Sequence, residues 1–465
     1  MRIVRRSLGT TIFAAGAALA VVPTSTFAQT ASAPDSTHIT SAAPDSTSNG
    51  RALPQPLPSP PFPGGDWLGS PLIGEPAPNT DGALMHVLSG TGFGQWLHSN
   101  RISIYGWVDP SVNFSTSKFT NLPLSYDIVP NRVELDQVML LIERNPNTVQ
   151  TDHIDWGFRL EGLYGIDYRF TTAKGYLSDQ LLTRNALYGF DPIEMYGLLY
   201  IPKVAEGLEF KIGRFISPPD IEAQLATNNY LFTHSIMFTF DPYTFTGIQA
   251  TLRLSPNWQL EAAVHAGNDM APWSNSARLN GNLMVRWTST NGDDGLWGGI
   301  NSLGNGQFTN SHDNLQQVVG TWGHRFGDRW HMMTEAYYMW QFNAATGGSC
   351  IFGMPQPYAG GGGCGAIIKG RSYSVGAVNY LQYLVDKKSY VSIRNDYFND
   401  PQGQRSGFAT AYSSHTVGYI RDVFDWLTVR PEVRYERAYM PHETPYDNGS
   451  KPSQFTIASD VIVKF

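Results

Sequence analysis

The chain has little cysteine, little charge and, after its N-terminus, no long apolar run. Only 2 of its 465 residues are cysteine, 15% are charged, and the formal net charge is −7. Without a basic surplus, nucleic acid is not indicated as a partner. Without a further run of roughly 20 apolar residues, helices would not carry the chain across a membrane. Two possibilities remain, export to a soluble compartment or insertion as a β-barrel.

The motifs of common enzyme classes are missing as well. The sequence has no Gly-x-Ser-x-Gly, no His-Glu-x-x-His and no phosphate-binding loop. Residues 360–365 match Gly-x-Gly-x-x-Gly only in letters, because no strand is predicted before them and no helix after them. Ser-His neighbours occur at His234–Ser235 and at Ser414–His415, but a hydrolase needs them to converge with an orienting group. We therefore predict no enzyme and no cofactor, with a membrane lipid hydrolase as the alternative.

The two cysteines, Cys350 and Cys364, enclose a glycine-rich segment. In an oxidising compartment we expect them to form a disulfide, and closing a loop of about 15 residues is worth roughly 3 kcal/mol on the chain-entropy model. Two free thiols are the alternative. A metal site needs more ligands at close spacing, so no bound metal is predicted.

The N-terminus has the features of an export signal. Residues 1–6 contain three arginines, residues 8–22 form an apolar stretch of small residues, and residues 26–28 offer a small-x-small cleavage site. We predict a signal peptide over residues 1–28 that is removed before Gln29. An uncleaved anchor helix is the alternative, but polar residues interrupt the stretch and it is shorter than a membrane span.

From residue 101 onward the sequence reads as one strand after another. Residues 427–436 are an example, with Leu, Val and Tyr on one face and Thr, Arg and Glu on the other. Side chains of a strand point alternately to its two faces, so such a strand is apolar outside and polar inside. This pattern, with charge on the polar face, is what a barrel with an aqueous lumen requires. A half-buried strand of a soluble sandwich is the alternative for any single segment.

Connection lengths give a second, independent indication. Short turns alternate strictly with long connections, which is the asymmetry of bacterial outer-membrane barrels and has no reason to occur in a soluble sandwich. We predict an all-β, transmembrane, antiparallel up-and-down barrel over residues 101–465 with sixteen strands; one missed or invented hairpin would give 14 or 18. The long connections are 115–130, 166–192, 217–245, 267–281, 303–312, 341–370, 399–407 and 437–453.

Paired aromatic residues match the height of a membrane. Trp330 and Trp340 lie ten residues apart on one strand face, and Phe455 and Phe465 bracket the last strand in the same way. Ten residues of tilted strand span roughly 25 Å, the height of an outer-membrane apolar band, so these four are the predicted membrane girdle. Aromatics scattered in a β-rich core are the alternative. The terminal strand ending on Phe465 resembles the assembly signal of outer-membrane barrels, which makes the barrel-assembly machinery an expected partner.

Two segments precede the barrel. Residues 29–81 are rich in Pro, Ser, Thr and Ala and repeat Ala-Pro-Asp-Ser-Thr at 33–37 and 43–47. With so little to bury, they are predicted to be a disordered periplasmic leader. The apolar residues within 82–100 predict a short amphipathic periplasmic segment, either plugging the lumen or lying on the rim.

Four segments carry a family resemblance. Residues 104–108 (IYGWV), 131–137 (NRVELDQ), 151–159 (TDHIDWGFR) and 213–222 (GRFISPPDIE) resemble the β-barrel porins of the OmpL-like type. The resemblance runs over residues 82–465 and implies an outer-membrane channel of a Gram-negative bacterium. Its implied role is passive diffusion of small hydrophilic solutes or ions, with outer-membrane lipid around it and a homotrimer or a monomer as the assembly. A non-conducting structural or adhesion barrel is the alternative.

The strand alternation also predicts which charges face the pore. Pore charge sets ion selectivity, although these groups could instead pair to stiffen the wall. The predicted pore-lining residues are Asp155, Arg159, Glu161, Lys211, Arg253, Arg286, Arg394, Asp396, Arg430, Glu432, Arg434 and Glu436. In general porins the third long loop folds inward, so we expect Asp220, Glu222 and Asp241 to form a constriction facing the arginines. A loop lying over the mouth is the alternative.

Overall fold

The computed structural model describes residues 73–76, 82–123, 126–218, 220–347 and 365–465. The predicted signal peptide, almost all of the predicted leader and both cysteines lie outside these residues. Unit Asn49–Phe465 contains everything that is described. None of the described helices is long and apolar enough to cross a membrane.

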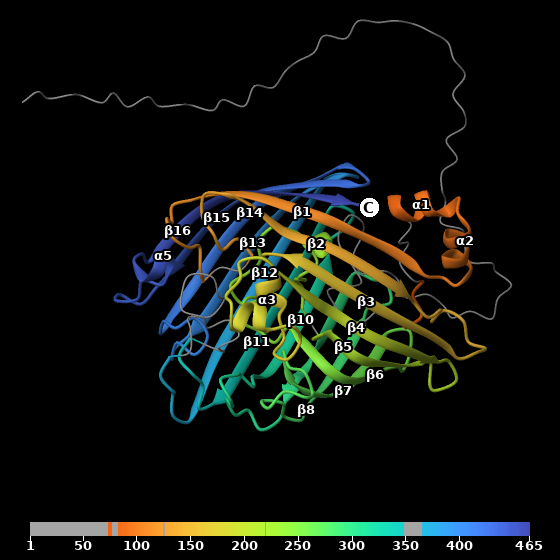
Figure 1. The fold of residues 1–465 in the computed structure, drawn as a ribbon, viewed down its shortest axis with the longest axis horizontal. Helices are drawn as coiled ribbons and strands as arrows, with labels where there is room; N and C mark the ends of the chain where they lie inside the picture. The colour runs from red at the N-terminus through yellow and green to blue at the C-terminus, as the bar shows by residue number, and fades with distance from the viewer. Residues whose placement is uncertain (1–72, 77–81, 124–125, 219, 348–364) are drawn as a thin grey trace, which may run out of the picture. The chain divides into compact units, whose positions relative to one another are not determined.

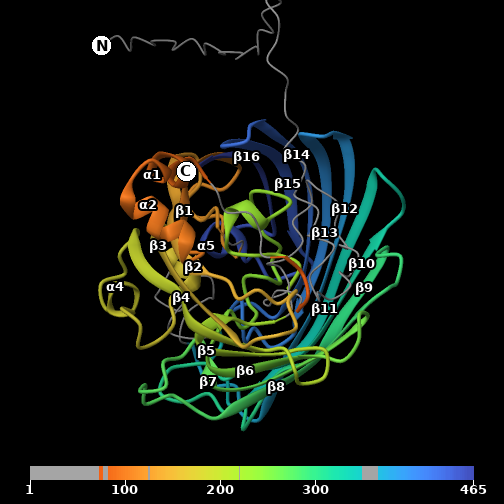
Figure 2. The same ribbon diagram turned by 90° about the vertical axis from the view of Figure 1, so that its right-hand side faces the viewer.

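Sixteen described strands form a closed antiparallel barrel in which each strand pairs with its neighbours in sequence, as predicted (Figures 1 and 2). Alternating apolar and polar residues with β-branched and aromatic side chains favour this extended backbone. The strands are β1 (Ser103–Ser115), β2 (Val133–Arg144), β3 (Asp155–Gly165), β4 (Gly189–Ile201), β5 (Leu208–Ile216), β6 (Thr244–Arg253), β7 (Trp258–Asn268), β8 (Asn280–Thr288), β9 (Asp294–Leu303), β10 (Gln316–Arg325), β11 (Trp330–Phe342), β12 (Arg371–Asp386), β13 (Ser389–Asp400), β14 (Thr410–Phe424), β15 (Leu427–Ala438) and β16 (Ser453–Lys464).

The barrel closes between its first and last strands. β1 and β16 pair in antiparallel register, with Val108 opposite Val463. The last residue extends this seam, because the Phe465 N–H donates to the Gly106 carbonyl at 2.9 Å and the Gly106 N–H donates back at 3.2 Å. Because the barrel closes here, neither β1 nor β16 is left with a free strand edge.

The two faces of the wall differ as the alternation predicts. On β15, Arg430, Glu432 and Arg434 point inward and are buried, whereas Val433 and Tyr435 point outward and are each 42% exposed. Outward-facing apolar side chains of this kind recur around the barrel, and an outer-membrane barrel presents such a surface to lipid. The predicted girdle residues Trp330, Trp340, Phe455 and Phe465 are all exposed or half-buried.

Two short helices lie at the end of the barrel that carries the C-terminus. They are α1 (Ala83–Ser89) and α2 (Gly92–Ser99), and Figure 1 shows them beside β1 and the chain end. Thr91 caps α2 by accepting a hydrogen bond from the Gly94 N–H at 3.0 Å. The Ile104 N–H lies 3.4 Å from the Met85 sulfur, which attaches α1 to the start of β1. The short turns lie at this end, so it corresponds to the periplasmic side of the predicted topology.

The long connections carry the remaining helices, and several fold into the barrel. These helices are α3 (Tyr168–Thr171), α4 (Asp179–Leu182), η2 (Ala226–Asn228) and α5 (Tyr446–Gly449). The connection between β5 and β6, residues 217–243, lies inside the ring of strands in the end-on view (Figure 2). Ile221, Tyr230 and Met237 of this segment are buried in one cluster with inward residues of β8 to β15. The largest buried cluster therefore sits within the barrel, between this loop and the wall.

Candidate pore constriction

The loop of residues 217–243, here called the inner loop, is held closed at its base. The Ser217 N–H donates to the Tyr243 carbonyl at 2.9 Å. Asp269 then accepts from the Tyr243 N–H at 3.2 Å and from the Thr244 N–H at 2.7 Å. Burial raises the pKa of Asp269 to about 6, and the backbone donors oppose that rise. The inner loop therefore enters and leaves the wall at one point and projects into the lumen.

Glu222 joins the inner loop to strands β12 and β13 of the wall. Its Oε1 lies 3.6 Å from Arg394 Nη1 of β13 and accepts from the Tyr380 hydroxyl of β12 at 2.6 Å. The same oxygen accepts from the Ser235 N–H at 2.8 Å, and the Ser235 hydroxyl donates to Oε2. One buried carboxylate thus joins two parts of the inner loop to two strands.

Arg394 is fully buried and paired on both sides. In addition to Glu222, it lies 3.4 Å from Asp396 on its own strand. Its Nη1 donates to the Thr233 carbonyl of the inner loop, and its Nη2 donates to the Thr416 hydroxyl at 3.0 Å. A buried guanidinium with this many partners fixes the geometry around it, because each donor has a defined acceptor.

Charged side chains of the wall bind the backbone of the inner loop. Glu432 Oε2 accepts from the Phe232 N–H at 3.0 Å and from the Thr233 N–H at 3.1 Å. Arg430 Nη1 donates to the Ala226 carbonyl at 2.6 Å and to the Asn229 carbonyl at 3.1 Å. These bonds satisfy main-chain groups that would otherwise be buried without partners.

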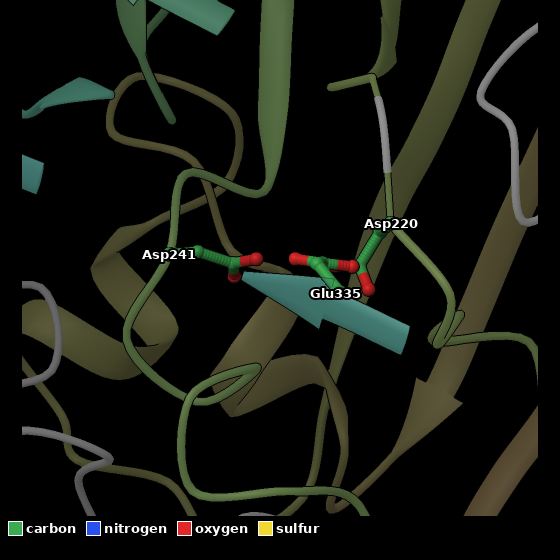
Figure 3. A group of neighbouring side chains, drawn as sticks. All are labelled: Asp220, Asp241 and Glu335. Carbon is green, nitrogen blue, oxygen red and sulfur yellow. The ribbon is translucent and has the colours of Figure 1, made fainter. Parts of the chain in front are cut away.

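Three carboxylates gather where the inner loop meets β11. Asp220 and Asp241 lie near the two ends of the loop, Glu335 lies on β11, and one oxygen of each falls within 4.8 Å of the others. Figure 3 shows the three side chains turned toward one another. Burial, followed by the neighbouring carboxylates, raises the pKa of Asp220 and of Asp241 well above the usual range. Glu335 Oε2 also accepts from the Ile221 N–H at 2.9 Å.

This arrangement differs in part from the expected one. The sequence predicted that Asp220, Glu222 and Asp241 would face arginines. The structure places Glu222 against Arg394, but it groups Asp220 and Asp241 with Glu335. Arg405, in the connection between β13 and β14, also contacts the inner loop. It donates to the Phe240 carbonyl at 3.1 Å and pairs with Asp313 at 2.5 Å.

The other predicted lumen charges lie on the inward face, and many form ion pairs in the wall. Arg159 pairs with Glu161 at 3.0 Å and with Glu194 at 3.1 Å. Arg434 pairs with Glu436 at 3.3 Å.

Near the periplasmic end, Asp155 is held by two arginines, Arg101 at 2.6 Å and Arg144 at 3.0 Å. Lys211 lies 4.8 Å from the centre of the Tyr196 ring, Arg286 lies 5.6 Å from the Trp297 ring, and Arg253 lies 3.4 Å from Glu206.

Some residues of the site were missed from the sequence. Asp460 pairs with Arg430, whose Nε lies 3.0 Å from each of its oxygens. The two residues are direct partners in the β15–β16 ladder, so the strand register could have revealed the pair. Glu335 lies on the polar face of β11 and was detectable by alternation, but its neighbours depend on the path of the inner loop.

The candidate hydrolase residues do not converge. His234 Nε2 lies 2.7 Å from the Ala223 carbonyl, and the neighbouring Ser235 hydroxyl donates to Glu222. His415 is exposed on the outer face of β14, where its Nδ1 lies 2.7 Å from Asn395 Oδ1, while Ser414 is buried on the inner face. Serine and histidine therefore lie on opposite faces of the wall in the second pair.

The chain is similar to a known family and to several solved structures. The family model described as "Putative beta-barrel porin-2, OmpL-like" matches residues 101–465. No curated protein sequence matches the chain. Similar solved structures include an anion-selective porin from Comamonas acidovorans, with 11% identity, a TM-score of 0.47 and coverage of 78% of this chain and 99% of that one. The outer-membrane channel DcaP of Acinetobacter baumannii has 9% identity, a TM-score of 0.46 and coverage of 78% and 97%.

Proposed function

Because this chain belongs to the OmpL-like β-barrel porin family, we propose that its inner loop constricts an outer-membrane channel that prefers cations. The protein is a porin of the Gram-negative outer membrane and passes small hydrophilic solutes or ions by passive diffusion. The finer proposal concerns what narrows the pore and which charge it favours. The constriction rests on the joining of Glu222 in the inner loop to Arg394 in the wall. The charge preference rests on the three carboxylates gathered at Asp220, Asp241 and Glu335.

The arginines predicted to line the pore are neutralised by their neighbours. Within the described residues, each of five forms an ion pair with a carboxylate: Arg159, Arg253, Arg394, Arg430 and Arg434. Arg286 lies near Glu75 and Glu261, and Lys211 lies near Glu209. These cations consequently leave little positive charge for a passing ion to meet.

Carboxylates, in contrast, are in excess near the inner loop. Asp220, Asp241 and Glu335 have no cationic partner among the described ion pairs. Arg430 already pairs with the Asp460 carboxylate, and two further carboxylates, those of Asp109 and Asp167, lie near it. A carboxyl group is negative when ionised and neutral when protonated, so none of these groups adds positive charge to the lumen. This surplus supports a preference for cations.

The test is a reversal-potential measurement in a planar bilayer under a KCl gradient. The wild-type channel is expected to reverse toward the potassium equilibrium potential. The triple variant Asp220→Asn, Asp241→Asn, Glu335→Gln should lose part of that shift, whereas the exposed control Asp179→Asn should keep it. A wild-type channel that reverses toward the chloride potential would refute the preference.

The helix pair α1–α2 is proposed to lie on the periplasmic rim at the lipid interface. Its exposed side chains include Val87 and the ring pair Phe93 and Trp96, whose centroids are 6.1 Å apart. Aromatic rings with this exposure suit the interface between lipid and water. The attachment of Met85 to the start of β1 supports a position on the rim rather than in the lumen.

Assembly partners follow from the C-terminal strand. We propose that β16, with Phe465 at its end, is recognised by the barrel-assembly machinery, after export by a cleaved signal peptide. A homotrimer is the proposed assembly, with a monomer as the alternative. Light scattering of the purified protein in detergent distinguishes the two.

We infer that the protein is not an enzyme. The positions of His234, Ser235, Ser414 and His415 support this inference, since none of the described serine hydrogen bonds reaches a histidine nitrogen. A micelle-based esterase assay with Ser235→Ala and Ser414→Ala variants tests it. Hydrolysis that depends on either serine would contradict it.

A further inference from the structure

A short N-terminal segment is bound inside the periplasmic end of the barrel. The Ile73 N–H donates to Gln259 Oε1 at 3.0 Å, and the Ile73 carbonyl accepts from Arg253 Nη1 at 3.0 Å. The Gly74 N–H donates to the Thr148 hydroxyl at 3.0 Å, and the same hydroxyl donates to the Glu75 carbonyl at 3.3 Å. Four hydrogen bonds thus hold three consecutive residues by their main chain.

The bound segment is closely fitted by shape. Ile73 is only 1% exposed, and a Cβ on Gly207 would lie 2.8 Å from its Cγ2. Gly74 has φ +98°, and a Cβ there would lie 1.7 Å from Arg253 Nη1. A side chain at position 74 would therefore be strained and would displace the guanidinium that binds Ile73. The cavity remaining beside Ile73 is about 10 Å³, room for about one water molecule.

The charge of the bound segment also matches that of the barrel residues around it. Arg253 and Arg286 both lie close enough to Glu75 to act on its carboxylate. Both arginines are at least nine-tenths buried, as are the hydrogen-bonding residues Thr148 and Gln259. The site therefore selects an apolar side chain, then glycine, then an acid.

The partners come from several consecutive hairpins. Thr148 lies in the β2–β3 turn, Gly207 in the β4–β5 turn, Arg253 and Gln259 at the β6–β7 turn, and Arg286 near the end of β8. All of these lie at the short-turn end of the barrel. A segment fastened to all of them crosses this side of the mouth, and Figure 2 views the barrel from this end.

We propose that the periplasmic mouth contains a peptide-binding site for an apolar-Gly-acid segment, and that Ile73-Gly74-Glu75 occupies it in cis and narrows the channel. The narrowing rests on the channel function of the chain. The binding does not, so the two parts are tested by separate measurements.

The binding is tested by protection of residue 73. In a Cys350→Ser, Cys364→Ser background, Ile73→Cys should react slowly with a water-soluble maleimide in the detergent-solubilised full chain. Adding Gly74→Ala should speed the reaction about tenfold, since local opening exposes the thiol. The control Gly90→Ala should not, because a Cβ at Gly90 meets nothing within 4 Å. Equal labelling rates with Gly74→Ala and with Gly90→Ala overturn the site.

The narrowing is tested by single-channel recording. Removal of residues 73–76 and the Gly74→Ala variant should each raise conductance about twofold, whereas Gly90→Ala should leave it unchanged. The tetrapeptide Ile-Gly-Glu-Pro, added to the periplasmic side of the deletion variant, should lower conductance again. If labelling accelerates but conductance stays constant, the segment binds without narrowing the channel and that part is overturned. If no variant passes current, the porin function itself fails, while the labelling result still decides the binding.

Discussion

Arg430 of β15 contacts both carboxylate oxygens of Asp460 of β16 and also binds the backbone of the inner loop. Arg430 Nε lies 3.0 Å from both carboxylate oxygens, and its Nη1 donates to the Ala226 carbonyl at 2.6 Å. The pair thereby holds the guanidinium in one orientation and aims it at the loop. The position of the inner loop is therefore set by the wall as much as by the loop itself.

Deleting Ala223–Phe240 should raise single-channel conductance. This segment occupies the barrel interior, and its removal opens that volume to water. Planar-bilayer recording measures the change, and the shift of the folded band on an unheated gel confirms that the variant is a barrel. Unchanged conductance in a folded variant would contradict a constricting role.

Replacing Glu222 with alanine should loosen the inner loop. The change removes the partner of Arg394 and the acceptor of Tyr380 and Ser235. Breaking a buried pair costs about 3 kcal/mol, although Asp396 still compensates part of the buried charge of Arg394. We expect more frequent current fluctuations and a lower urea midpoint in detergent. The exposed control Asp179→Asn should change neither quantity. A Glu222→Ala channel with the current fluctuations and urea midpoint of the wild type would argue against the contact.

Cation preference should fall as the pH is lowered, beginning above the usual carboxyl range. The pKa values of Asp220 and Asp241 are raised well above 3.8, so both groups lose charge at a higher pH than an exposed aspartate does. An acid with a raised pKa binds its proton more tightly in the folded protein than in the unfolded chain. Its contribution to stability is therefore complete below the ordinary pKa and is lost as the pH rises through the raised value.

Reversal potentials recorded across a pH series measure this effect. The Asp220→Asn, Asp241→Asn double variant should give a flatter profile than wild type. A wild-type profile that changes only near pH 4 would show that the two carboxyl groups titrate as ordinary surface groups.

Removing Phe465 should impair assembly without altering selectivity. Its backbone N–H and carbonyl both bond to Gly106 across the seam, and a Cβ on Gly106 would lie 2.8 Å from its ring. The folded fraction in outer-membrane preparations should drop, whereas Lys464→Ala should assemble normally. Channels that do form should keep the wild-type reversal potential. If the chain without Phe465 assembles normally, Phe465 is not part of the assembly signal.

Much of the fold could be predicted because alternation and turn length are local signals. The strand seen by its pattern at 427–436 is Leu427–Ala438, and the terminal strand expected over 455–465 is Ser453–Lys464. The sixteen-strand closed barrel, with both ends at short turns, is confirmed. A strand needs only its own residues to reveal its two faces.

The candidate site could be predicted only in part because loops have no period. Glu222 was expected opposite an arginine and lies beside Arg394, whereas Asp220 and Asp241 meet Glu335 through a loop path that the sequence does not encode locally. The site of Ile73 depends on residues from four hairpins that are close only after the barrel closes. Contacts at such sequence separation become visible only in the folded chain.

The wall holds the inner loop by its main chain, through Glu432 on two N–H groups and Arg430 on two carbonyls. Recognition of this kind is indifferent to the side chains at those loop positions. The barrel can therefore serve as a fixed frame in which the loop sequence is exchanged to retune the pore, provided that the loop keeps its length and backbone course.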